Sequence, residues 1–278
     1  MIVAVINCKG GTGKTTTSVN LSAAWAALGF RVLLIDLDAQ ANASLSLGIA
    51  AADLSPSAMD MLFDDVPIES VIRSTSTTGL DLVTGESELA SSDLILADLP
   101  DREKLLAHVL GSAKERYDFV ICDCPPAMSM LSVNAVVAAD QYIVPISPEY
   151  LALEGLITLL STISRMKASM DIKAELLGIL FTMVNLDRLP TRRREMKIQL
   201  KIIRLVQQQY GTDVFQAFVP RDVRLSETAA HGQTILEFAP NSKVATQHIR
   251  VADEVLRRCG ITNQADDSMK REEEGHGQ

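Results

Sequence analysis

A glycine-rich turn between an apolar strand and a helix constrains this 278-residue chain more than any other feature. The run Ile2–Ile6 precedes the turn, and a helical segment that stops at Gly29 follows it. Glycines let backbone N–H groups curl around an anion, and the start of a helix adds partial positive charge. The sequence therefore predicts a phosphate-binding loop made of Lys9, Gly10, Gly11, Thr12, Gly13, Lys14, Thr15 and Thr16. In such a loop Lys14 contacts the β- and γ-phosphates of a nucleotide, and the Thr15 hydroxyl ligates Mg²⁺.

Short β-branched runs alternate with helical segments along the chain, and they predict the strands of a sheet. They are Ile2–Ile6, Arg31–Ile35, Leu80–Val83, Phe119–Cys122, Tyr142–Ile146, Leu177–Val184 and Val214–Val219. Strands that are apolar throughout are buried on both faces, which is typical of a mostly parallel sheet covered by helices. The expected fold is α/β, a doubly wound sheet with helices on both faces. We expect one domain over residues 1–262 and a disordered, charged tail over residues 263–278.

The apolar residues do not predict a membrane protein. No stretch reaches the roughly 18 to 20 uninterrupted apolar residues of a membrane helix, and the N-terminus lacks the basic region of a signal peptide. The expected location is the cytoplasm. Of the four cysteines, Cys122 and Cys124 form a C-x-C in an apolar run, with no second pair and no nearby histidine. A zinc site is therefore disfavoured, and we expect reduced, mostly buried thiols.

Three aspartates follow predicted strands. Asp36 and Asp38 end the run RVLLIDLD, and Asp123 ends the run YDFVICD. One strand-end aspartate is often only a turn or helix-capping residue. Parallel strands deliver their carboxyl ends to the same edge of a sheet, so three such aspartates beside a phosphate loop favour a metal and water site.

The octet Lys9–Thr16 resembles the deviant Walker A motif of the ParA/MinD family of P-loop ATPases. Cys8 occupies the first glycine position of the usual P-loop pattern, and Lys9 supplies the additional lysine of the family. The segments SPEYLALEG (147–155), GILFTMVN (178–185) and VPRDVRLSETAAHGQTI (219–235) resemble the Soj subgroup of small ParA proteins.

The resemblance implies a role for each matching position. Lys9, Lys14 and Asp38 would be catalytic: Lys9 would reach a partner subunit's nucleotide, and Asp38 would polarise the attacking water. Thr15, Asp36 and Asp123 would surround Mg²⁺, with Asp123 as the Walker B residue. ATP would be the nucleotide, and its adenine would lie near Asn185, Pro220 and Asp222. Ala39 stands where the family usually has proline, which puts the hydrolysis rate in question.

Basic residues gather in one part of an acidic chain. The net charge is −9, yet residues 186–224 hold nine basic and four acidic side chains. Residues 191–210 predict an amphipathic helix with Ile198, Ile202, Leu205 and Val206 on its apolar face. Its basic stripe is either a solvated face or a contact for DNA phosphates, and the family resemblance favours DNA. The candidate DNA contacts are Arg193, Lys197, Lys201, Arg204, Arg221 and Arg224.

The resemblance implies a DNA-positioning ATPase. An ATP-bound homodimer would bind the nucleoid without sequence preference, and a ParB-like or cargo-adaptor protein would stimulate slow hydrolysis. The cargo would be a plasmid, a chromosome or a protein complex. The acidic region 53–101 is a candidate docking surface for the partner, although it also fits a solvated face.

Two alternatives share the same phosphate loop. A MinD-like protein would bind membranes through a basic amphipathic C-terminus, but this chain ends in KREEEGHGQ, which an anionic membrane repels. An iron–sulfur carrier or a nitrogenase-like iron protein would need cysteines at a dimer axis. Cys124, beside Asp123, stands close to where such a ligand would be expected, whereas the strand position and apolar neighbours of Cys122 favour packing.

Overall fold

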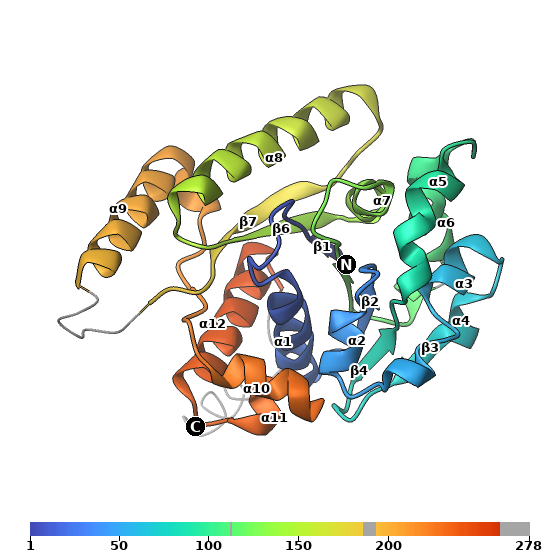
Figure 1. The fold of residues 1–278 in the computed structure, drawn as a ribbon, viewed down its shortest axis with the longest axis horizontal. Helices are drawn as coiled ribbons and strands as arrows, with labels where there is room; N and C mark the ends of the chain where they lie inside the picture. The colour runs from blue at the N-terminus through green and yellow to red at the C-terminus, as the bar shows by residue number, and fades with distance from the viewer. Residues whose placement is uncertain (112, 186–192, 262–278) are drawn as a thin grey trace, which may run out of the picture.

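The computed structural model of the protein describes residues 1–111, 113–185 and 193–261 and is built around a seven-stranded β-sheet (Figure 1). The strand order is β3-β4-β2-β5-β1-β6-β7, and only the short edge pair β3 and β4 is antiparallel. The strands are β1 (Ile2–Val5), β2 (Val32–Asp36), β3 (Ile72–Ser74), β4 (Leu80–Val83), β5 (Phe119–Asp123), β6 (Gln141–Ile146) and β7 (Glu175–Phe181). This confirms the mostly parallel sheet and six of its seven expected strands.

Two hydrophobic clusters cover the two faces of the sheet. Along β1, Ile2 and Ala4 belong to one cluster while Val3 and Val5 belong to the other, as alternation along a strand requires. Helices α7 (Met130–Ala138) and α8 (Tyr150–Ser169) pack on the first face. Helices α1 (Lys14–Ala27) and α12 (Lys243–Arg258) pack together on the second (Figure 1). The doubly wound arrangement is therefore confirmed.

Shorter helices complete the two layers. Five of them lie between β2 and β5 in the chain: α2 (Asn42–Ser46), α3 (Ala58–Phe63), α4 (Ile68–Val71), α5 (Ser92–Leu96) and α6 (Leu105–Val109). A sixth, α10 (Arg224–His231), follows α9. Helix α11 (Ile235–Phe238) precedes α12, and the long helix α9 (Arg193–Tyr210) lies at one end of the molecule (Figure 1). None of the helices in the described ranges combines the length and apolar character that crossing a membrane requires.

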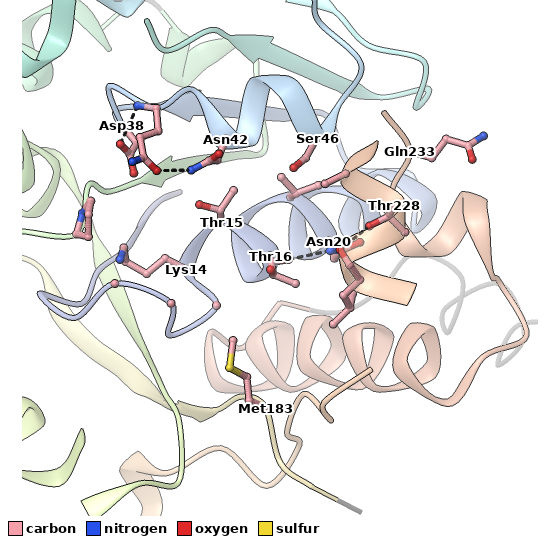
Figure 2. A pocket seen from close by; sticks show the side chains of 18 residues that line it. Lys14, Thr15, Thr16, Asn20, Asp38, Asn42, Ser46, Met183, Thr228 and Gln233 are labelled. Carbon is pink, nitrogen blue, oxygen red and sulfur yellow. Dashed lines mark hydrogen bonds between the residues drawn. The ribbon is translucent and has the colours of Figure 1, made fainter. Parts of the chain in front are cut away.

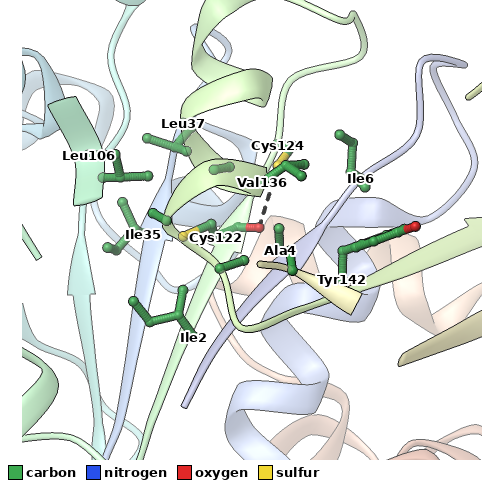
Figure 3. Packing of buried hydrophobic residues seen from close by; sticks show 14 of the residues in the cluster. Ile2, Ala4, Ile6, Ile35, Leu37, Leu106, Cys122, Cys124, Val136 and Tyr142 are labelled. Atoms are coloured by element: carbon green, nitrogen blue, oxygen red, sulfur yellow. Dashed lines mark hydrogen bonds between the residues drawn. The ribbon is translucent and has the colours of Figure 1, made fainter. Parts of the chain in front are cut away.

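The cysteine pair at the carboxyl end of β5, with Cys122 in the strand and Cys124 directly after it, is part of the core. Both Cys122 and Cys124 are fully buried in the first cluster, where Figure 3 shows them among Ala4, Ile35 and Val136. All four thiols are free, and burial raises the pKa of Cys122 to about 12. A packing role is confirmed for this pair, whereas Cys8 is exposed and Cys259 is partly exposed.

The expected strand Val214–Val219 is wrong. Val214 forms an isolated bridge with Ile179 of β7, and Pro220 forms one with Val184 beyond the end of β7. The Phe215 and Val219 N–H groups donate to the Ile179 and Phe181 carbonyls, but a side chain takes the N–H groups of the residues after Phe215. The buried Glu254 carboxylate accepts hydrogen bonds from the Gln216 and Ala217 N–H groups at 2.8 to 3.0 Å. Periodicity could not reveal this competition, because Glu254 lies 37 residues further along the chain. The structure also adds β3, a three-residue edge strand too short for its sequence pattern to indicate.

Candidate nucleotide-binding site

The predicted phosphate loop joins β1 to α1 at the carboxyl edge of the sheet. Gly11 and Gly13 have φ values of 70° and 82°, a backbone region that favours glycine. A Cβ at Gly13 would also lie 3.3 Å from the Thr182 side chain. Helix α1 therefore begins directly at Lys14, with no capping side chain and no acidic residue in its first turn. Its N-terminal amides and helix dipole can act on a bound anion.

Polar contacts from neighbouring strands hold the loop in place. Asn7 Nδ2 donates to the Pro145 carbonyl at 2.7 Å, and Asn7 Oδ1 accepts from the Lys9 N–H at 2.9 Å. On the other side, Thr182 Oγ1 donates to the Thr12 carbonyl at 2.7 Å. The loop is thus positioned by β6 and β7, which the motif alone does not reveal.

Lys14 is held inside the loop. Its side chain is buried, and its Nζ donates to the Lys9 carbonyl at 3.3 Å. Burial lowers the pKa of the Lys14 ammonium, while the nearby Asp123 carboxyl acts in the opposite direction. Figure 2 shows Lys14, Thr15 and Asp38 around one cavity of about 360 Å³, which the three loop glycines and Thr16 also line.

The two strand-end aspartates lie side by side, since Asp36 and Asp123 are register partners on β2 and β5. Both are fully buried, and burial raises the pKa of each carboxyl. Asp123 Oδ1 accepts from the Ser18 hydroxyl at 2.8 Å, whereas its buried Oδ2 has no hydrogen-bond partner. A buried oxygen without a partner is costly unless a cation or a water completes it.

Asp36 shapes the loop that carries Asp38. One of its oxygens accepts from the Ser44 N–H at 2.9 Å and the Ser44 hydroxyl at 2.8 Å, and the other accepts from the Asp38 N–H at 3.2 Å. Only glycine fits at position 85, where the chain packs against this loop, because a Cβ there would lie 2.6 Å from the Asp38 carbonyl oxygen. Asp38 lines the cavity, while Asp36 and Asp123 lie behind its lining.

These residues fit a magnesium site that a bound phosphate completes. In the described part of the chain no three His, Cys, Asp or Glu side chains are arranged to hold a metal by themselves. Mg²⁺ in phosphate-transfer sites usually takes one or two protein ligands, phosphate oxygens and water. The Thr15 hydroxyl and the unpartnered Asp123 Oδ2 suit that requirement.

A second cavity of about 310 Å³ adjoins the first, and the two share Gly13, Thr16, Met183 and Leu225. Two of the expected adenine contacts, Pro220 and Asp222, line it. Asn185 lines neither cavity, and its N–H donates to Gln199 Oε1 at 3.0 Å. Met183, which reaches both cavities with a φ of 53°, carried no signal in the sequence.

Lys9 does not line the cavity, although Gly10 beside it does. Its Nζ forms a 2.7 Å salt bridge with Glu149, and the two side chains are 41% and 61% exposed. An exposed pair of this kind contributes about 0 to 1 kcal/mol, so Lys9 can exchange Glu149 for another anion at little cost. Sequence reasoning missed Glu149, although it lies in the segment 147–155.

The expected DNA-contacting residues lie partly on α9 and partly in the segment that leads into α10. Lys197, Lys201 and Arg204 are exposed on α9 and line one groove with Leu200, Leu205 and Gln208. The Arg193 side chain and residues 186–192 lie outside the described residues. Arg221 is exposed, but the Arg224 guanidinium binds the Asp222 carboxylate at 2.6 and 2.9 Å.

The expected apolar face of α9 is only partly correct. Ile202 and Val206 are buried, whereas Ile198 and Leu205 are 51% and 41% exposed. The helix lies at the end of the sheet, so only a narrow stripe of it meets the core. Its outer face is therefore both basic and apolar.

Comparisons with known proteins agree with this geometry. A family model described as an AAA domain matches residues 1–176. The sporulation initiation inhibitor protein Soj of Bacillus subtilis is 38% identical over 254 residues, covering 91% of this chain and 97% of that protein. The chromosome partitioning protein ParA of Caulobacter vibrioides is 35% identical over 259 residues, covering 92% and 94%.

The fold also matches solved structures. Cobyrinic acid a,c-diamide synthase from Mycobacterium smegmatis, solved with ADP or an ATP analog and magnesium, is 30% identical with a TM-score of 0.79. The match covers 93% of this chain and 95% of that chain.

Proposed function

Because the chain belongs to the ParA/MinD family of P-loop ATPases, we propose that it partitions or positions an intracellular cargo through an ATP-dependent, DNA-binding dimer. It is an ATPase that uses ATP and Mg²⁺, like its relatives. The single observation that carries the proposal is the meeting of the phosphate loop, Asp38 and the Asp36–Asp123 pair at one edge of the sheet.

The residues of the site have separate tasks in hydrolysis. The loop amides and Lys14 hold the β- and γ-phosphates, so that charge developing on the γ-phosphate is already compensated. Asp38 orients a water molecule against the γ-phosphorus and accepts its proton as ADP leaves and inorganic phosphate forms. Mg²⁺, held by Thr15 and by Asp123 through water, would neutralise further phosphate charge. Asp36 positions Asp38 through the loop between them.

In a dimer, the partner subunit would add a further positive charge, Lys9, beside the γ-phosphate. The Lys9 side chain is exposed and forms a salt bridge with the exposed Glu149, so it can exchange this partner for the γ-phosphate of a second subunit. Hydrolysis would then be slow in the monomer and tied to dimer formation. ATP would act as the link between two subunits, and its loss would separate them.

The basic face of α9 would hold the dimer on DNA. Lys197, Lys201 and Arg204 are exposed on this face. Such contacts are independent of sequence and weaken with salt, because their energy comes from counterion release. A ParB-like or cargo-adaptor protein would stimulate hydrolysis and release the dimer from the nucleoid. The relatives named for chromosome partitioning support this use of the switch.

The test is DNA binding by Asp38→Ala with ATP, with ADP and without nucleotide, over a salt series. We expect binding to random duplex DNA only with ATP, because a subunit that cannot hydrolyse ATP stays dimeric. The control is Asp38→Ala combined with Lys14→Ala. Loss of charge-assisted bonds should weaken its ATP binding about 10- to 100-fold and so abolish DNA binding. Equal binding in all nucleotide states would contradict the proposal, and binding to anionic vesicles instead of DNA would favour the MinD-like alternative.

A further inference from the structure

Helix α5 and the turn after it carry an exposed apolar patch that neither the nucleotide site nor α9 uses. Leu94 is 80% exposed, while Ile95 and Leu99 are 39% and 42% exposed. Leu96 is fully buried, so α5 is anchored on one side while Leu94 and Ile95 stay exposed, and Leu99 follows in the turn after the helix. Three large exposed aliphatic residues within six positions are unusual on a protein surface and commonly mark an interaction site.

Carboxylates flank this patch along the chain. Residues 86–104 contain six acidic and two basic side chains. Glu88, Asp93 and Asp98 are exposed, and among the described residues a salt bridge is recorded for only one acidic side chain of the segment, Asp101. The exposed apolar residues are thus flanked in the sequence by exposed carboxylates, which we call the rim of the patch, and such an arrangement selects partners by charge.

We propose that the α5 patch, formed by Leu94, Ile95 and Leu99 with the flanking carboxylates, is a docking site for a basic amphipathic segment of a partner protein. Lysines or arginines of the segment would pair with the rim while its apolar face covers Leu94. A second copy of the chain fits poorly, because a two-fold contact would place the same carboxylates against one another. DNA and anionic membranes would be repelled for the same reason.

The position of the α5 patch would allow a partner protein to bind while α9 is in contact with DNA. Figure 1 shows α5 and the basic helix α9 at opposite ends of the molecule, so the two surfaces do not compete. The patch is also joined to the nucleotide site. Asp93 Oδ1 accepts from the Met130 N–H at 2.8 Å at the start of α7, and Pro126, four residues before, lines the phosphate cavity.

The experiment uses nucleotide-free protein and a fluorescent 18-residue amphipathic peptide of leucine and lysine, with binding followed by anisotropy. A matching peptide of leucine and glutamate is the probe control. We expect the lysine peptide to bind more tightly and Leu94→Ser to weaken it about tenfold. Glu88→Gln with Asp98→Asn should weaken binding and reduce its salt dependence. Leu200→Ser with Leu205→Ser, two exposed leucines of α9, should leave it unchanged.

Amide hydrogen exchange locates the bound peptide. Protection within residues 87–104 is the expected result. Protection elsewhere, unchanged affinity in Leu94→Ser, or tighter binding of the glutamate peptide would overturn the proposal. So would self-association of the free protein that Leu94→Ser abolishes, which would assign the patch to a second copy. Because no nucleotide is present, the outcome is independent of ATP-dependent DNA binding.

Discussion

At the residue scale, the chemistry depends on side chains that the fold buries against their preference. Lys14, Asp36, Asp38 and Asp123 are all buried. The Ser18 and Ser44 hydroxyls donate to Asp123 and Asp36, and Lys14 donates to a carbonyl of the loop, so three of the four are held in defined positions. Such groups are costly to bury, and the cost is offset when phosphate and magnesium supply the opposite charges. Binding of the nucleotide should therefore stabilise the fold as well as complete the site.

His248 on α12 is another buried polar residue, and it is not part of the nucleotide site. Its Nδ1 lies 3.0 Å from the Val244 carbonyl, and its Nε2 is buried with no partner. Burial lowers the pKa of His248 to about 4, so the folded protein keeps it neutral while the unfolded chain takes up a proton below about pH 6.5. The stability due to neutral His248 is present above pH 6.5 and is lost as pH falls toward 4.

We therefore expect acid to reduce the stability of the protein more than that of His248→Leu. Between pH 7 and pH 4 the difference in unfolding free energy between the two proteins should change by about 3 kcal/mol. Urea unfolding followed over this pH range measures it. If the unfolding free energies of the two proteins changed equally with pH, His248 would not be responsible for the loss of stability in acid.

At the element scale, α12 determines how the edge of the sheet ends. Glu254 accepts the Gln216 and Ala217 N–H groups and pairs with Arg258, whose guanidinium lies over the Phe215 ring and donates to the Leu177 and Val214 carbonyls. The Glu254 side chain is 8% exposed and that of Arg258 is 20% exposed. This ion pair therefore satisfies the N–H groups of residues 216 and 217, which have no partner on β7.

Glu254→Ala should destabilise the protein by about 3 to 5 kcal/mol, because it leaves the Arg258 charge and two N–H groups without partners. Denaturant unfolding measures the change. Lys167→Ala, which removes one side of the more exposed Lys167–Glu175 pair, should cost no more than about 1 kcal/mol. Equal effects of the two substitutions would contradict the role assigned to Glu254.

A separate prediction concerns the contribution of helix α9 to DNA binding. Replacing Lys197, Lys201 and Arg204 with alanine should lower the slope of log affinity for DNA against log salt by about 3 units, since each phosphate contact contributes about 0.9. Titrations of duplex DNA with the Asp38→Ala protein and ATP measure this slope. Alanine at the exposed Lys114, Arg116 and Lys173 is the matched control. An unchanged slope would remove α9 from the DNA surface.

At the scale of the whole molecule, the proposed function depends on joining two subunits through ATP. Lys9→Ala in the Asp38→Ala protein should abolish the ATP-dependent dimer while the monomer still binds ATP. Sedimentation velocity with ATP and a nucleotide-binding titration separate the two effects. Lys167→Ala is the control, since Lys167 forms a 2.7 Å ion pair like that of Lys9 but belongs to α8. A dimer that survives Lys9→Ala would contradict a trans role for this lysine.

Local signals in the sequence were sufficient for the parallel sheet, the phosphate loop and the strand-end aspartates. Each depends on a short run of neighbouring residues: continuous apolar strands, glycines at positive φ, and carboxylates directly after strands. Because parallel strands end at one edge, even the proximity of Asp36 and Asp123 followed from the pattern.

Only the tertiary structure could decide the contacts between distant segments. The Lys9–Glu149 pair, the Glu254 clamp on residues 216–217 and the exposure of Ile198 and Leu205 join or separate parts of the chain far apart in sequence. Periodicity describes which face of an element is apolar, but not how much of that face its neighbours cover. The identity of six strands and of the phosphate loop was therefore local information. Burial, pairing and the absence of the expected strand over residues 214–219 depended on the packing of the whole molecule.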